Sequence, residues 1–271
     1  MKIDKKNILF LVFVLTVLIS LLVLLFILPP SSHEPLDLEL PIEKAIDFLK
    51  LTDEPHALLW LDVIYRRFGI QEFADSSQRY DVILNQLSGE QLQLHVFRRI
   101  IDYNNSIQKK DLDRFVGIDE IVVPALYCDR FGLSDDYASL LEENINLGRY
   151  ELTHVLLALV WINDNGYEIP LSNSTIKNIY RANSNLIDDD YVVDDLELEA
   201  AVFLYLAGQG ELVNPIFIER VIETQNDDGG WSISGKSVVS DWHPSVLGLL
   251  LLLHANSPLD HYPPILPSLS S

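Results

Sequence analysis

Apolar residues recur at three- and four-residue spacing along most of the chain beyond residue 41, which is the pattern of amphipathic helices. Glycines such as Gly69 and Gly148 follow these runs, at the position where glycine commonly ends a helix. Ser172 and the pair Asn214-Pro215 supply the residues that commonly begin one. No segment alternates apolar and polar residues over the length of a strand, so the pattern predicts an all-α fold.

Two kinds of helix follow from the pattern. One kind has a charged face, whereas the other is apolar on nearly all sides and is therefore expected to be buried. The buried kind recurs along the chain in a degenerate repeat of roughly 30–50 residues. We therefore expect paired outer and inner helices, arranged as a closed α/α toroid, a partial toroid or an open solenoid. The inner helices should begin near His56, Asp119, His154, Asp195 and His243.

The chain begins with a strongly apolar run from Ile8 to Leu28. About twenty apolar residues suffice to span a bilayer, and the run is longer than the apolar region of most secretory signals. Three lysines precede it, and the next basic residue after it is Lys44. The positive-inside rule then places the N-terminus in the cytoplasm and the rest outside. We expect a single-pass membrane protein with an extracytoplasmic domain.

These observations divide the chain into five expected parts. Residues 1–7 are cytoplasmic, 8–28 form the membrane anchor and 29–41 form a tether. Residues 42–257 form the helical domain, and 258–271 form a tail rich in proline and serine.

Charge and cysteine content narrow the function. The formal net charge of −21 repels nucleic acid, so no nucleic-acid partner is expected, whereas cations or basic partners are favoured. Cys128 is the only cysteine, which rules out an intrachain disulfide and zinc sites built on several cysteines. It stands in an apolar run, where a cysteine is usually a small buried side chain.

The segment Gln225–Trp231, with the sequence QNDDGGW, resembles the glutamine–tryptophan repeat of squalene and terpenoid cyclases and of protein prenyltransferase β-subunits. The resemblance covers about thirty residues and implies an α/α-toroid fold. We expect Gln225 to close an outer helix, the glycines to reverse the chain, and Trp231 to pack back on the helix ends.

The same resemblance implies a zinc site. Prenyltransferases carry an Asp-x-Cys pair after this loop and complete the site with a distant histidine. Asp241 falls on the aspartate of that pair, and His243 stands where the cysteine would be. The chain ends before the later histidine of the family, so a metal would have to recruit His154, His56 or a carboxylate from another helix. In the alternative, Asp241 only caps a helix and no metal binds.

Other carboxylates offer further possibilities. The cluster Asp188, Asp189, Asp190, Asp194 and Asp195 does not fit the Asp-x-Asp-Asp acid motif of the cyclases. It could bind Ca²⁺ or Mg²⁺, or form a solvated loop and helix start.

Three functions therefore remain open. The first is a diverged toroid that binds a ligand or protein partner. The second is a metal-dependent enzyme centred on Asp241 and His243, acting on a prenyl or lipid-linked substrate. The third is a carbohydrate-active enzyme with paired carboxylates such as Asp195 and Asp119, which would need a separation of about 5–9.5 Å.

Overall fold

The computed structural model describes residues 36–87, 91–188, 191–257 and 262–267. All regular structure in these ranges is helical, which confirms the predicted all-α class. Within them, extended backbone pairs only at an isolated antiparallel bridge between Trp231 and Asp241. The expected anchor at 8–28 lies outside the described residues. None of the described helices is both long and apolar enough to cross a membrane.

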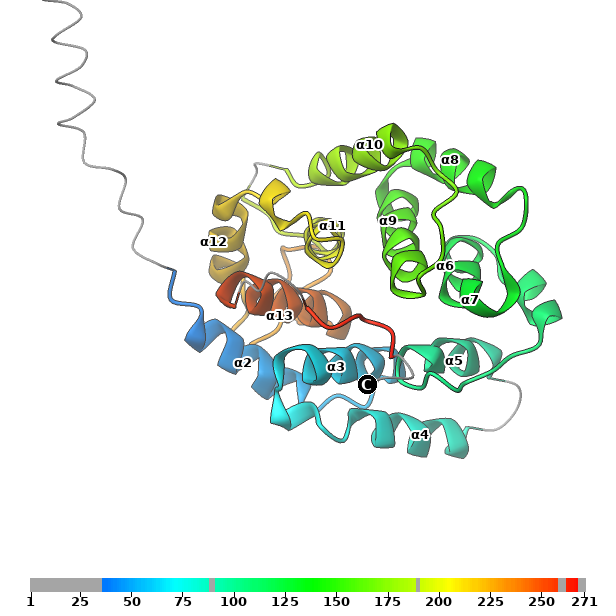
Figure 1. Ribbon diagram of the computed structural model, residues 1–271. Helices are drawn as coiled ribbons and strands as arrows, with labels where there is room; N and C mark the ends of the chain where they lie inside the picture. The colour runs from blue at the N-terminus through cyan, green and yellow to red at the C-terminus, as the bar shows by residue number, and fades with distance from the viewer. Residues whose placement is uncertain (1–35, 88–90, 189–190, 258–261, 268–271) are drawn as a thin grey trace, which may run out of the picture. The chain divides into compact units, whose positions relative to one another are not determined.

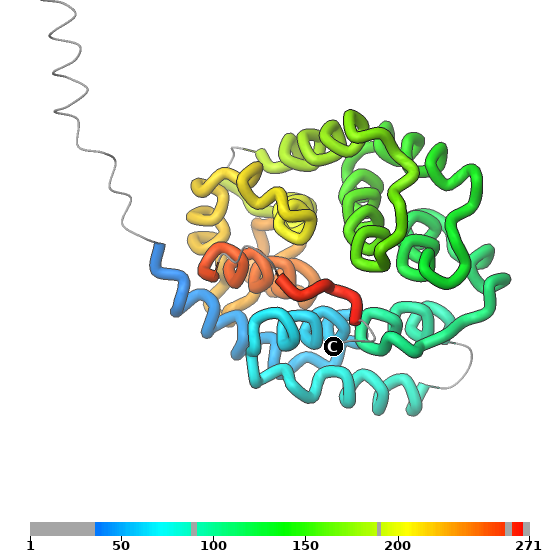
Figure 2. Tube along the Cα trace, viewed as in Figure 1, coloured from blue at the N-terminus to red at the C-terminus, as the bar shows by residue number. Residues whose placement is uncertain are grey.

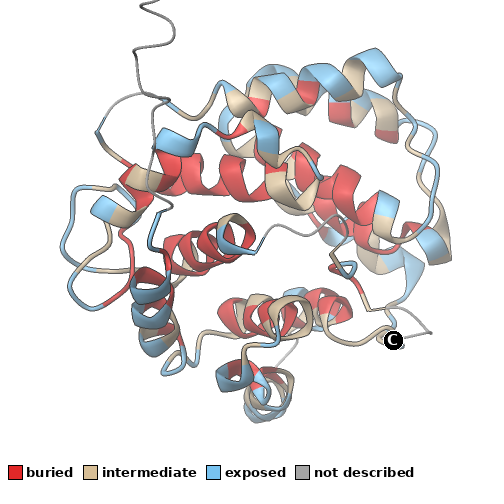
Figure 3. Cartoon of the chain, turned by 60° about the vertical axis from the view of Figure 1, so that its left-hand side comes forward, coloured by how far each residue is buried: buried red, intermediate tan, exposed pale blue. Residues whose placement is uncertain are grey.

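Five helices carry most of the buried residues. In Figures 1 and 3 they lie inside the other helices of the unit Leu38–Ser271. They contact one another in the order α3, α13, α11, α9 and α6. Their bounds are Pro55–Phe68 (α3), Ile118–Leu126 (α6), Arg149–Asp164 (α9), Asp195–Leu206 (α11) and Trp242–Asn256 (α13).

An outer set of helices covers this inner set. Helix α4 packs on α3, α8 and α10 pack on α9, and α2 and α12 pack on α13. Each outer helix buries one face only, as α12 does with Phe217, Ile218 and Val221. The bounds of the outer helices are Glu39–Leu49 (α2), Ser76–Gln86 (α4), Tyr137–Leu147 (α8), Asn173–Ser184 (α10) and Pro215–Glu223 (α12). Two short helices, α5 (Leu92–Phe97) and α7 (Cys128–Phe131), complete the described α-helices, and short 3₁₀ helices are formed by Gln71–Phe73, Arg98–Ile100, Lys109–Arg114 and Gly210–Leu212.

The inner helices are apolar on most sides because they have neighbours on most sides. Every residue of α13 from Pro244 to His254 is buried, and so is every residue of α11 from Asp195 to Leu204. Helices α3, α6, α11 and α13 begin within one residue of the positions predicted from the sequence, whereas α9 begins earlier, at Arg149.

The Gln225–Trp231 segment joins three helices. The side-chain amide of Gln225 donates to the carbonyls of Pro41 and Gly229, both at 2.9 Å. The buried indole of Trp231 donates to the carbonyl of Val221 at 2.8 Å and lies against Gly248 of α13. The segment therefore fastens α12 to α2 and α13. Trp231 packs near the end of α12, as predicted, but against the middle of α13.

The C-terminal segment 262–267 runs past the C-terminal ends of inner helices α3 and α9 (Figure 2). Ile265 and Leu266 are buried there, and their N–H groups donate to the carboxylate of Asp164 at 2.8 and 3.3 Å. The guanidinium of Arg66 donates to the carbonyl of Ile265 at 2.9 Å. Part of the expected tail 258–271 is therefore integral to the domain.

The N-terminal boundary also shifts slightly. Helix α2 begins at Glu39, and Leu38 before it is buried, so the helical domain begins at Leu38 rather than at residue 42. Leu36 and Asp37 are the described residues of the preceding unit, and both are exposed.

Candidate functional site

All five inner helices line one cavity of about 170 Å³, and four of them supply its polar groups. His56 of α3, Asp119 of α6, His154 of α9 and His243 of α13 line it with polar groups. Its remaining walls are mostly aromatic and aliphatic, and the aromatic members are Trp60, Phe97, Trp161, Phe203 and Trp242. The cavity therefore combines a polar end with an apolar body, which is the usual make-up of a small-molecule site.

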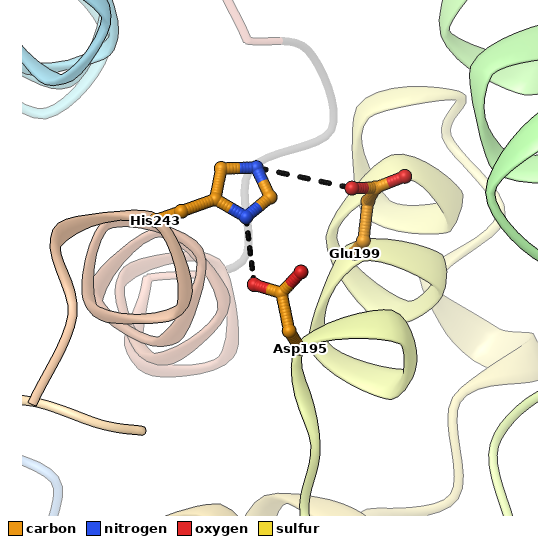
Figure 4. A group of neighbouring side chains, drawn as sticks. All are labelled: Asp195, Glu199 and His243. Carbon is orange, nitrogen blue, oxygen red and sulfur yellow. Dashed lines mark hydrogen bonds and ion pairs between the residues drawn. The ribbon is translucent and has the colours of Figure 1, made fainter. Parts of the chain in front are cut away.

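The fifth inner helix, α11, supplies two carboxylates that hold the histidines. Asp195 and Glu199 stand four residues apart and point toward His243 (Figure 4). Nδ1 of His243 lies 2.6 Å from Oδ1 of Asp195, and its Nε2 lies 3.8 Å from Oε2 of Glu199. Nδ1 of His154 lies 3.1 Å from the other oxygen of Glu199. The two carboxylates and two imidazoles form one continuous group.

Neighbouring groups on α9 fix both carboxylates. The hydroxyl of Tyr150 donates to Oδ2 of Asp195 at 3.1 Å, and the hydroxyl of Thr153 donates to Oε1 of Glu199. The carbonyl of Tyr150 accepts from Nδ1–H of His154 at 2.8 Å. Since this bond places the proton on Nδ1, the neutral form of His154 keeps its lone pair on Nε2.

The surroundings shift the proton affinity of the lining groups. Burial lowers the pKa of His243 and of His154, but the nearby carboxylates more than offset this, so both pKa values are raised. Hydrogen bonding to Asp195 is the main favourable influence on the pKa of His243, whereas the charge of Glu199 is the main one for His154. Burial also raises the pKa of Asp119, despite its hydrogen bond from Gln93.

Asp241 was expected to bind a metal together with His243 and His154, but its role in the structure is different. Its Oδ1 accepts the backbone N–H of His243 at 2.9 Å, so it is the N-cap of α13. Within the described residues, the group whose atoms could share a metal ion is Asp195, Glu199 and His243, with one ligand atom of each within 4.8 Å of the others. Asp241 is outside this group, and His154 adjoins it through Glu199.

The described members of the acidic cluster at 188–195 do not act as a unit. Asp194 caps α11 in a reciprocal pair with Glu197: each accepts the other's backbone N–H, at 3.0 Å. Asp195 points to His243, and residues 189–190 lie outside the described ranges. Cys128 is buried and burial raises its pKa to about 11, so it is an inert thiol, as its apolar surroundings predicted.

One buried donor in the cavity wall has no partner. Trp161 is 1 % exposed, and its Nε1–H forms no hydrogen bond to any described residue. A buried indole N–H normally finds an acceptor, because leaving it unpaired costs on the order of 1–3 kcal/mol. Trp161 lines the cavity but its N–H is buried, so a bound molecule could supply that acceptor only after the indole ring shifts.

A larger cavity, of about 800 Å³, lies at the opposite ends of the same helices. The polar groups that line it serve the C-terminal segment: Asp164 accepts two N–H groups, and Arg67 lies 4.9 Å from the ring of Tyr262. His254 is completely buried, and burial lowers its pKa to about 4. These contacts hold the chain together, so this cavity is not the better site.

Sequence reasoning found most of the site but missed Glu199. The residues that begin buried helices were expected to face a common space, and His56, Asp119, His154 and His243 do so. Glu199 lies one turn inside α11. A glutamate within a helix that is otherwise apolar on all sides was the available signal, since an isolated buried carboxylate requires a partner.

Comparisons of the chain with protein-family models, with curated proteins and with solved structures found no match.

Proposed function

We propose that Leu38–Ser271 is a ligand-binding domain whose site is the 170 Å³ cavity. The observation that carries this proposal is the meeting of His56, Asp119, His154 and His243, from four helices, around one aromatic-walled space. Polar residues from four separate helices gather at a single point more readily for recognition than for packing, which aliphatic side chains would serve better.

The ligand class follows from the walls. A cavity of about 150 Å³ holds a benzene molecule, so this one suits a single ring or the ring-shaped end of a longer molecule. The unpaired N–H of Trp161 would favour a ligand with a hydroxyl or carbonyl oxygen, provided that the ring shifts to present it to the cavity. We infer a cyclic, largely apolar ligand with one oxygen acceptor.

The wider setting is part of the same proposal. Each inner helix contacts the next in a continuous series, and most of them are covered by an outer helix. This arrangement is consistent with an α/α toroid or a partial one. The turn at Gln225–Trp231 supports a diverged relationship to the cyclase and prenyltransferase fold. The apolar run at 8–28 would anchor the domain outside the membrane, with its N-terminus in the cytoplasm.

A carbohydrate-active enzyme is less well supported. Asp119 lines the cavity, but Asp195 is held by His243 and Tyr150 and does not line it. The second carboxylate is therefore not presented to a substrate in this cavity.

Calorimetric titration with two ring compounds of similar size tests the proposal. Phenol carries an oxygen acceptor and toluene does not, so we expect phenol to bind the full chain more tightly, by roughly 2–10-fold. Trp161→Phe removes the N–H and keeps a ring, so it should abolish the preference for phenol.

Val122→Phe, which fills the cavity from α6, is the control, and it should weaken both compounds while circular dichroism shows an intact fold. If V122F binds each compound as tightly as the wild type does, the cavity is not the site.

A further inference from the structure

We propose that Asp195, Glu199 and His243 bind one zinc ion. The site differs from the one that the prenyltransferase resemblance implies, because both carboxylates come from α11 and Asp241 takes no part. It also goes beyond the cavity proposal, because an ion can bind there without any organic ligand.

The first argument is geometric. Asp195 and Glu199 are one helical turn apart, so their side chains project from the same face of α11 toward His243 of α13 (Figure 4). One ligand atom from each lies within 4.8 Å of the others. Zinc holds oxygen and nitrogen ligands at about 2.0–2.2 Å, which places those atoms roughly 3–3.5 Å apart. Side-chain rotations that turn one nitrogen of His243 and both carboxylates toward a common point would close the site.

The second argument is electrostatic. Asp195 is 6 % exposed and Glu199 is 1 % exposed, yet the ion pairs of both carboxylates within the described residues are with histidines alone. Two buried carboxylates without lysine or arginine need nearby positive charge, which either protonated His154 and His243 or a divalent ion can supply. A divalent ion bound by neutral imidazoles would balance both carboxylates.

The third argument is the arrangement around the carboxylates. Tyr150 and Thr153 donate to the oxygens of Asp195 and Glu199, and the backbone of Tyr150 fixes the ring of His154. Hydrogen bonds of this kind orient metal ligands in known sites. Such bonds would keep both carboxylates directed at one point.

The fourth argument is access. His243 and His154 line the cavity, whereas Asp195 and Glu199 lie behind them. An ion held by Asp195, Glu199 and His243 would adjoin the cavity through His243, so a water molecule or the oxygen of a ring-shaped ligand could complete its coordination. Mixed carboxylate and imidazole ligands favour zinc over Ca²⁺ and Mg²⁺, which prefer all-oxygen sites.

Zinc content measured by plasma mass spectrometry tests the site directly. The full chain should be purified without chelator and with a tag that does not bind metal. We expect about one zinc per chain, whereas Glu199→Gln and His243→Gln should each lower zinc affinity by at least about 100-fold, since even an outer hydrogen-bond partner costs 10–100-fold.

Asp241→Asn is the matched control. It also removes one carboxylate near His243, but asparagine caps a helix as well as aspartate does, so this variant should fold and keep its zinc. A wild-type chain without zinc would overturn the proposal. So would a D241N chain that loses zinc while E199Q retains it.

Should E199Q or H243Q fail to fold, X-ray absorption at the zinc edge of the wild type decides. We expect nitrogen and oxygen neighbours at about 2.0–2.2 Å, including imidazole. A sulfur neighbour at about 2.3 Å would place the ion at Cys128 and refute the site. Because no ring compound enters these measurements, zinc binding and phenol binding can fail independently.

Discussion

The histidines at the two ends of the inner helices have pKa values shifted in opposite directions. His154 and His243 face carboxylates, which raise their pKa values, whereas His254 is buried among a carbonyl, an arginine and aromatic rings. Nδ1–H of His254 donates to the carbonyl of Leu250 at 2.7 Å. Burial lowers the pKa of His254 to about 4, so the folded chain holds this residue neutral.

The low pKa of His254 predicts a loss of stability in acid. Its pKa is about 6.5 in the unfolded chain, so the stabilisation present above pH 6.5 declines as pH falls toward 4, by about 3 kcal/mol in all. Urea unfolding at pH 7 and pH 4 measures the change. His254→Asn keeps a donor toward Leu250 but does not titrate, so its acid loss should be smaller by that amount. Equal losses in the two proteins would contradict the prediction.

The element scale shows what sequence patterns can and cannot predict. The apolar-on-all-sides pattern predicted the buried helices, and with them His154, His243 and Asp119 as lining residues. It did not predict Glu199, because a helix interior is where an apolar pattern directs attention to packing. The family resemblance, rather than the apolar pattern, assigned Asp241 to metal binding. Aspartate is also among the commonest N-cap residues, and that is the role of Asp241 in α13.

The capping role of Asp241 predicts a specific pair of stabilities. Asp241→Ala removes the acceptor of the His243 N–H and should cost about 1 kcal/mol of unfolding free energy. Asp241→Asn should cost close to nothing, because asparagine accepts the same bond. Urea denaturation of both variants checks this. Equal destabilisation by alanine and asparagine would mean that the carboxylate charge, rather than the cap, matters at this position.

At the scale of the described domain, contacts between distant parts of the sequence tie the C-terminal segment to one end of the helix array. Ile265 accepts a hydrogen bond from Arg66, 199 residues earlier, and donates one to Asp164, 101 residues earlier. No local pattern reveals such contacts, so a segment rich in proline and serine was expected to be a tail. Because the polar groups at this end are engaged with the C-terminal segment, the aromatic cavity at the other end is the better-supported site.

Burial of the C-terminal segment predicts that two isoleucine substitutions will have very different effects on the free energy of unfolding. Ile265 is 1 % exposed, so Ile265→Ala should cost about 2–5 kcal/mol of unfolding free energy. Ile233 is 55 % exposed, so Ile233→Ala should change it by no more than about 0.5 kcal/mol. Thermal unfolding of both variants measures the difference. A negligible effect of Ile265→Ala would show that the segment is not part of the folded core.

The most direct test of the binding cavity is a crystal structure of the chain after phenol has diffused into the crystal. We predict density for one ring among His154, Trp161 and His243, with its oxygen within about 3.2 Å of Nε1 of Trp161. Phenol bound only elsewhere, with this cavity collapsed or filled by protein side chains, would contradict the account.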